Sequence, residues 1–207
     1  GVKPEDTEVS IKFHQLGVRI LCIDVAHGDS GHCLDMITST KNMFPDMIII
    51  AGNVATGEGA RRLWEAGADV VKVGIGPGSL CTTRIQTGNG VPQLTAIMDV
   101  AEVQKELRQL EDVRKLPHEY HRTYSFIADG GIKSAGDIVK ALCFADMVMV
   151  GNLFAGARET PGDIHIINGI CHKEYAGSST HKTSRVEGVV AWVPCKGTYQ
   201  EILTPLL

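Results

Sequence analysis

The sequence predicts an α/β fold in which βα repeats build a parallel sheet. Short apolar runs rich in β-branched residues alternate with stretches of helical periodicity, and polar or glycine residues follow each apolar run. The chain has 207 residues, of which 43% are hydrophobic and 23 are glycine. It is therefore long enough to bury the core of one such domain, and we treat residues 1–207 as a single domain.

Five strands and four helices are expected. In chain order they are strand Val18–Ile23, helix Gly31–Met43, strand Met47–Ala51, helix Gly57–Ala66, strand Asp69–Val73, helix Leu94–Arg114, strand Ser125–Ala128, helix Ala135–Phe144 and strand Asp146–Val150. In the longest helix Val103, Leu107, Leu110 and Val113 recur every three or four residues, which predicts one buried face. Glu111 is expected on the charged outer face of this helix.

The number of repeats leaves two architectures open. A closed barrel needs eight βα units and about 250 residues, whereas five units are found. The fold is either a smaller open sheet or part of a longer barrel. The first residues, Gly1 to Asp6, resemble a loop that leaves an unseen strand, and this favours the second interpretation.

Charge and cysteine content exclude several classes of function. The formal net charge is -4 and no basic block occurs, so nucleic acid is not an expected partner. The six cysteines form no CxxC pair, which argues against both a zinc site and a disulfide framework. We expect an intracellular protein, in the cytoplasm or in an organelle such as the peroxisome or glycosome, because neither a signal peptide nor a membrane-spanning run is found.

The most informative segment is the loop from Gly74 to Arg84, which places Cys81 after three glycines. Glycines let bare backbone approach an anion or a metal ion. The loop follows the strand Asp69–Val73, and α/β enzymes keep their sites at the carboxyl ends of strands. A glycine-rich turn beside a structural cysteine is the alternative, but Thr82 and Thr83 make the setting polar and favour a reactive thiol.

Similar residues follow the other strands, and a parallel sheet gathers them at one edge. They are Asp24, Gly52-Asn53, Asp129-Gly130-Gly131 and Gly151-Asn152. His27 lies at the same edge and is a further functional candidate, with a plain surface histidine as the alternative. His118 and His121 lack a carboxylate or cysteine at metal-ligand spacing, so a surface loop is favoured there.

These motifs resemble the IMP dehydrogenase/GMP reductase family. The resemblance rests on stretches that occur in the family's order along nearly the whole chain: Ile23 to Gly28, Ala51 to Val54, Val71 to Ser79, Cys81 to Arg84, Thr87-Gly88, Gly90, Pro92 to Leu94, Ala128 to Gly131 and Met149 to Gly156. It implies a (β/α)8 barrel in which the five strands found here are strands 4 to 8. Thr82 and the stretch Lys72 to Gly78 resemble the reductase branch, because the dehydrogenases usually carry isoleucine in place of Thr82.

The resemblance implies NADPH-dependent conversion of GMP to IMP and ammonia. Cys81 would add to carbon 2 of the purine, and Thr83 would assist proton transfer to the leaving ammonia. Oxidation of IMP with NAD, the dehydrogenase reaction, is the alternative, and a non-catalytic purine-nucleotide sensor is a third possibility. A homotetramer or octamer is expected.

The remaining site residues also come from the resemblance. Asp129 would bind the ribose, Ser79, Gly131, Gly151 and Asn152 the 5′-phosphate, and Ser178, Ser179 and Glu187 the purine. Asp24, His27 and Gly74 would lie toward the nicotinamide, and the carbonyl oxygens of Gly76, Gly78 and Cys81 would bind a monovalent cation such as K⁺. The family's flap glutamate, the partner of Thr83, is not found in the stretch Tyr175 to His181, and its role is not transferred to His181.

Overall fold

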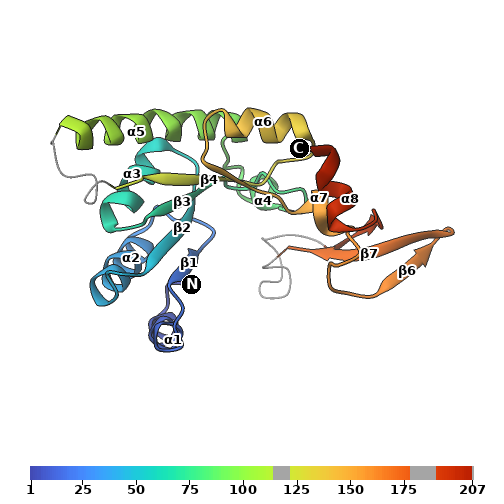
Figure 1. Cartoon of the computed structure of the whole chain (residues 1–207), viewed down its shortest axis with the longest axis horizontal. Coiled ribbons are helices and arrows are strands. Elements are labelled where there is room, and N and C mark those ends of the chain that lie inside the picture. The colour runs from blue at the N-terminus through green and yellow to red at the C-terminus, as the bar shows by residue number, and fades with distance from the viewer. Residues whose placement is uncertain (114–121, 178–189, 207) are drawn as a thin grey trace. The chain divides into compact units, whose positions relative to one another are not determined.

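A computed structural model of the chain describes residues 1–113, 122–177 and 190–206 (Figure 1). A five-stranded sheet has the order β1-β2-β3-β4-β5, and its first three strand pairs are parallel. The strands are β1 (Ile20–Asp24), β2 (Ile48–Val54), β3 (Val70–Val73), β4 (Ser125–Asp129) and β5 (Met147–Met149). The predicted α/β class and its parallel strands are therefore confirmed.

The helices between these strands follow the sequence pattern closely. Their bounds are α2 (Gly31–Met43), α3 (Gly57–Ala66), α5 (Gln93–Val113) and α6 (Ala135–Leu142). In α3 the Thr56 side chain accepts a hydrogen bond from the Gly59 N–H at 3.1 Å, and Gly67 ends the helix with φ 118°. A left-handed residue at this position is a common helix stop that glycine adopts without strain, which explains why both ends of α3 were predictable.

The expectation for the first residues is wrong. Helix α1 spans Pro4–Gln15, so the segment Gly1 to Asp6, which was expected to be a loop, already contains the first turn of a helix. Proline is favoured at the first helical position because its missing N–H has no partner there in any case. Asp6 reinforces this start by accepting a hydrogen bond from the Lys3 N–H at 2.8 Å.

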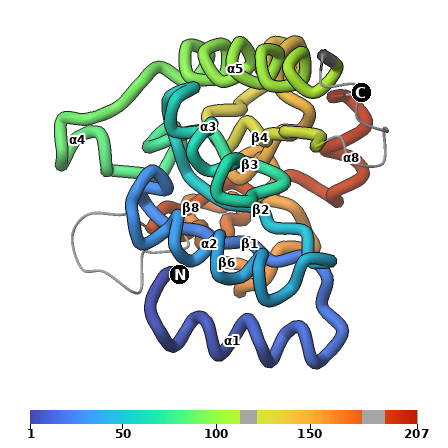
Figure 2. Tube along the Cα trace, turned by 90° about the vertical axis from the view of Figure 1, so that its left-hand side faces the viewer, coloured from blue at the N-terminus to red at the C-terminus, as the bar shows by residue number. Residues whose placement is uncertain are grey.

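The chain divides into two compact units. Unit 1 comprises residues 1–75, 91–128 and 144–147, and unit 2 comprises residues 76–90, 129–143 and 148–207. Within unit 1, α1 and α5 run along opposite edges of the trace (Figure 2). The core of unit 1 includes Ile37, Ile49, Leu63 and Trp64, all fully buried.

The buried face of α5 differs from the prediction at two places, because Gln104 is buried in place of Val103 and Glu111 in place of Leu110. Val100, Gln104, Leu107 and Glu111 are buried, whereas Leu110 is 46% exposed. The two buried polar residues have partners that sequence periodicity does not reveal. Gln104 Nε2 donates to the Tyr124 carbonyl at 2.7 Å, and Glu111 Oε1 accepts from the Tyr124 hydroxyl at 2.6 Å.

Unit 2 contains elements that the sequence pattern did not predict. A three-stranded antiparallel sheet is formed by β6 (Ile164–Ile167), β7 (Ile170–Ala176) and β8 (Val190–Pro194). The described part of this unit also contains three short helices, α4 (Thr83–Thr87), α7 (Asn152–Ala155) and α8 (Tyr199–Leu203), and a 3₁₀ turn over Thr204–Leu206, besides the predicted helix α6. In the part of the chain that the structure describes, no helix is long and apolar enough to cross a membrane.

Candidate functional site

The main site lies within unit 2, around a cavity of about 200 Å³. It is formed where the segment after β4, the segment after β5 and the glycine loop meet β7. The lining residues are Gly78, Ser79, Asp129, Gly130, Gly131, Ile132, Lys133, Met149, Val150, Gly151, Asn152 and Tyr175. Six of the predicted residues are therefore brought together: Gly78, Ser79, Asp129, Gly131, Gly151 and Asn152.

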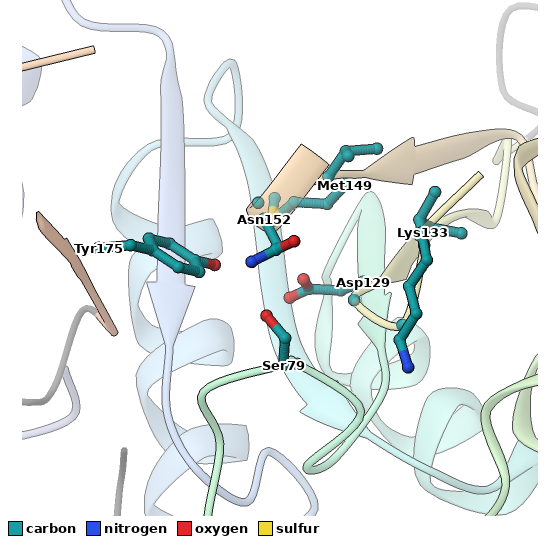
Figure 3. A pocket seen from close by; sticks show the side chains of 12 residues that line it. Ser79, Asp129, Lys133, Met149, Asn152 and Tyr175 are labelled. Carbon is teal, nitrogen blue, oxygen red and sulfur yellow. The ribbon is translucent and has the colours of Figure 1, made fainter. Parts of the chain in front are cut away.

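The polar side chains of this cavity converge. In Figure 3 the polar ends of Ser79, Asp129, Asn152 and Tyr175 turn toward one another, while Lys133 extends away from them. The Gly130 N–H donates to the Met149 carbonyl at 3.2 Å and so joins the two segments that carry Asp129 and Asn152. One carboxylate, one amide and two hydroxyl groups thus face a common space, which suits a ligand with several hydroxyl or oxyanion groups.

Tyr175 is a lining residue that sequence reasoning missed. A Cβ placed on Gly151 would lie 2.7 Å from the Tyr175 hydroxyl oxygen, so the tyrosine fills the space that the glycine leaves. The sequence located Tyr175 only as the start of the flap. The signal that could have found it is the absence of a side chain at Gly151, which leaves room for a large neighbour.

Cys81 and Thr83 form a pair in the same unit. The Cys81 thiol donates a hydrogen bond to Thr83 Oγ1 at 3.1 Å. The Cys81 N–H also donates to the Gly78 carbonyl at 3.1 Å, and Thr83 is the first residue of α4. Both side chains are partly exposed. A thiol and a hydroxyl this close together can act at one site, the thiol of Cys81 as a nucleophile and the hydroxyl of Thr83 as a proton-transfer group.

The glycine loop supplies oxygen atoms of the type that binds a monovalent cation. Gly76 has φ 76°, and a Cβ there would lie 2.7 Å from Arg84 Cγ, so Arg84 packs against bare backbone. Carbonyl oxygens are suitable ligands for K⁺. One of the three expected ligands, the Gly78 carbonyl, already accepts the Cys81 N–H, and its second lone pair remains available. Groups of three or more His, Cys, Asp or Glu side chains suited to a metal are absent from the described residues.

In unit 1 an ion pair fixes Asp24 at the end of β1. Asp24, Gly52 and Lys72 lie in one row across β1, β2 and β3. Because Gly52 has no side chain, Lys72 reaches across β2, and its Nζ lies 2.6 Å from Asp24 Oδ1. Lys72 is only 5% exposed, whereas the Asp24 side chain is 55% exposed. Sequence analysis selected Asp24 but missed the buried lysine that orients its carboxylate.

The other two predicted residues of unit 1 have different surroundings. His27 is exposed, and Gly74 is buried, with its N–H donating to the Val54 carbonyl at 2.8 Å and its carbonyl accepting from Asn53 Nδ2 at 2.8 Å. Near His27, two hydrogen bonds from Arg62 hold the pKa of the Asp29 carboxyl below its usual value. The proposed purine contacts Ser178, Ser179 and Glu187, and also His181, lie outside the described residues.

Comparison with known proteins decides the family. The family model described as "IMP dehydrogenase / GMP reductase domain" matches residues 1–207. The chain belongs to this family. It is 42% identical to an inosine-5′-monophosphate dehydrogenase of Pasteurella multocida over 222 aligned positions, with 98% of this chain and 42% of the relative covered. The dehydrogenase of Streptococcus pyogenes is 47% identical over 178 positions, with 86% and 33% covered.

A solved structure resembles the chain over its whole length. It is a crystal structure of a cysteine-to-alanine variant of GMP reductase from Trypanosoma brucei in complex with guanosine 5′-monophosphate. The TM-score is 0.85 at 36% identity, with 100% of this chain and 43% of that chain covered. The family and this likeness identify the five βα units as part of a (β/α)8 barrel. The chain spans about a third to two fifths of the length of these relatives.

Proposed function

We propose that this chain belongs to a GMP reductase, which converts GMP and NADPH to IMP, ammonia and NADP. The observation that carries the proposal is the 3.1 Å hydrogen bond between Cys81 and Thr83 in the unit that contains the polar cavity. The likeness of the whole chain to part of a GMP reductase structure supports the choice of reaction. Family membership supports an oxidoreductase acting on a purine nucleotide.

In this proposal Cys81 is the nucleophile. Its sulfur, as a thiolate, adds to carbon 2 of guanine, because a soft anionic sulfur reacts readily with an electron-poor ring carbon. The Thr83 hydroxyl, one hydrogen bond from the sulfur, would pass a proton to the amino group that leaves as ammonia. A hydroxyl is a weak acid and needs a carboxylate partner for this step. We propose that this partner lies outside the described residues.

The cavity would hold the nucleotide by its ribose phosphate. Asp129 would accept hydrogen bonds from the ribose hydroxyls, since a carboxylate is an acceptor-only group. Ser79, Gly131, Gly151 and Asn152 would donate to the 5′-phosphate, and the Tyr175 hydroxyl beside Gly151 is a further donor. Ser178, Ser179 and Glu187 remain the proposed contacts to the purine ring.

NADPH would supply the hydride that replaces the amino group at carbon 2. The exposed carboxylate of Asp24, oriented by Lys72, fits a role as acceptor for a cofactor amide or hydroxyl, and His27 and Gly74 are its proposed neighbours. The carbonyl oxygens of Gly76, Gly78 and Cys81 fit a monovalent cation such as K⁺. We also propose a homotetramer or octamer within the cell.

The specific alternative is IMP dehydrogenase, which would oxidise IMP with NAD. It is favoured by the names of the curated relatives, which are 42% to 47% identical to this chain. Both reactions use a thiol nucleophile, so Cys81 alone does not distinguish them. The two reactions are distinguished by the cofactor and by the nucleotide that each one consumes.

The deciding experiment offers both substrate pairs to the full-length protein. We expect loss of the NADPH absorption band with GMP and no formation of NADH from IMP and NAD. Cys81→Ala should lower the rate by about a thousandfold or more while GMP still binds, because only the covalent step is removed. Cys143→Ala, which changes an exposed cysteine elsewhere in unit 2, is the matched control and should leave the rate unchanged. NADH formation without GMP-dependent NADPH loss would overturn the reductase proposal in favour of the dehydrogenase.

A further inference from the structure

Two cysteines of unit 2 lie opposite each other, Cys171 on β7 and Cys195 directly after the last residue of β8. In the antiparallel pair of β7 and β8, His172 is opposite Pro194, so the next pair along is Cys171 and Cys195. The Cys195 N–H donates to the Cys171 carbonyl at 2.9 Å, which confirms that the pairing continues to these residues. Both cysteines are free thiols in this structure.

The backbone geometry at this pair is suitable for a disulfide. Opposite residues that exchange hydrogen bonds in an antiparallel ladder have Cα atoms about 5.5 Å apart. Disulfides span Cα separations of about 4.4 to 6.8 Å. Opposite residues also place their side chains on the same face of the sheet. Pro194 is opposite His172, at a pair of the ladder that is not joined by hydrogen bonds. Its missing N–H is not needed there, so the proline does not disturb the register of the two cysteines.

Neighbouring contacts hold the two strands in place. Cys171 lies on the central strand β7, where it also pairs with Ile166 of β6. After Cys195, the Lys196 N–H donates to the Gly156 carbonyl at 2.8 Å. The backbones of Cys171 and Cys195 are therefore held opposite each other by hydrogen bonds on both sides. Closing the bridge needs rotation of both side chains and a small approach of the two Cβ atoms, because opposite residues have Cβ atoms about 4.5 to 5.5 Å apart and a disulfide needs about 3.5 to 4.5 Å.

Exposure separates this pair from the buried cysteine of α2. Cys171 is exposed and Cys195 is partly exposed, so a small oxidant has access to at least one thiol. Cys33, in contrast, is fully buried, and burial raises the pKa of its thiol to about 11. Oxidation by peroxide requires thiolate character and access, which Cys33 lacks.

We propose that Cys171 and Cys195 form a peroxide-responsive dithiol that closes reversibly to a cross-strand disulfide. The exposed thiolate of Cys171 attacks one peroxide oxygen and becomes a sulfenic acid, with release of one water. The Cys195 thiol then attacks this sulfur, forms the S–S bond and releases a second water. In total two thiols and one hydrogen peroxide give one disulfide and two waters, and a dithiol reductant reverses the change.

The site is linked to the cavity through β7. Cys171, Lys173 and Tyr175 are alternate residues of this strand and so share one face of it. Tyr175 lines the cavity, and Lys173 is buried with its Nζ 2.6 Å from the Thr160 carbonyl. The disulfide would therefore restrain the strand that supplies Tyr175. The proposal is independent of which nucleotide the cavity binds.

The test uses the full-length protein with Cys81→Ser, so that the proposed nucleophile does not react. After limited treatment with hydrogen peroxide, we expect two free thiols fewer per chain and a crosslinked peptide pair containing Cys171 and Cys195. Dithiothreitol should restore both thiols. With Cys195→Ser added, the crosslink should disappear and dimedone should label Cys171 as a sulfenic acid.

Cys143→Ser is the matched control, because Cys143 is also exposed and lies in unit 2. This variant should keep the crosslink. Peptide mapping of the Cys81→Ser protein, which retains Cys171 and Cys195, does not depend on whether the Cys195→Ser or Cys143→Ser variants fold. The proposal is overturned if peroxide yields sulfenic or sulfinic acid at Cys171 while Cys195 stays a free thiol, or if crosslinks to other cysteines form at equal yield.

Discussion

Gly52→Ala tests the row of residues that joins Asp24 to Lys72. A Cβ at position 52 would lie 2.7 Å from both the Cβ and the carbonyl oxygen of Lys72. Contacts this short force a backbone shift, and overpacking of this kind costs about 1 to 3 kcal/mol. For a chain of this size each kcal/mol lowers the melting temperature by about 2 to 4 °C. We therefore expect Gly52→Ala to unfold roughly 2 to 12 °C below the wild type in a thermal scan followed by circular dichroism.

Two further variants identify the cause of this loss. Gly31, the first residue of α2, has open space where a Cβ would stand, with no heavy atom within 4 Å, so Gly31→Ala should leave stability unchanged or raise it by about 0.4 to 1 kcal/mol. Lys72→Met keeps both atoms that clash but removes the charge. Gly52→Ala should then cost about the same in the Lys72→Met background as in the wild type. A melting temperature of Gly52→Ala at or above the wild-type value would refute the packing argument, and a cost that vanishes with Lys72→Met would show that the ion pair is responsible instead.

Two more predictions concern titratable groups of unit 1. Arg62 lowers the pKa of Asp29, so the pair stabilises the folded state above the ordinary aspartate pKa of about 3.9, and this contribution is lost as the pH falls through the lowered value. Urea unfolding of wild type and Arg62→Met should therefore differ at pH 7 and converge in strong acid; a difference that persists unchanged at about pH 2 would contradict this. Because burial raises the pKa of Cys33 to about 11, iodoacetamide at mildly alkaline pH should alkylate it more slowly than the exposed Cys22, as peptide mass spectrometry would measure. Equal rates would show that the Cys33 thiol is accessible in the folded chain.

Local signals made the parallel sheet and its helices predictable. Helices α2 and α3 begin and end at the residues that the pattern indicates, since caps such as Thr56 and Gly67 act on their own turn. The pattern is less reliable where a polar side chain is buried. Glu111 was expected in solvent, but it is buried and one oxygen of its carboxylate accepts a hydrogen bond from the Tyr124 hydroxyl.

The lining of the polar cavity was predictable to a similar extent. Ser79, Asp129, Gly131, Gly151 and Asn152 follow strands, and parallel strands bring their carboxyl ends to one edge. The antiparallel sheet β6-β7-β8 was not predicted, because the apolar residues of its strands are largely exposed and form no buried run. Tyr175 was consequently missed along with the strand that carries it.

The sequence by itself determined the α/β class, the order of the repeats and the position of the glycine loop that carries Cys81. These depend on periodicity, on strand-end residues and on glycine, all of which act over a few neighbouring positions. Only the tertiary structure decided that Lys72 holds Asp24, that Tyr175 fills the space beside Gly151, and that Cys171 faces Cys195. The members of each pair lie far apart in the chain, so only the fold brings them together. Strand register does so for Lys72 with Asp24 and for Cys171 with Cys195, and no local pattern encodes that register.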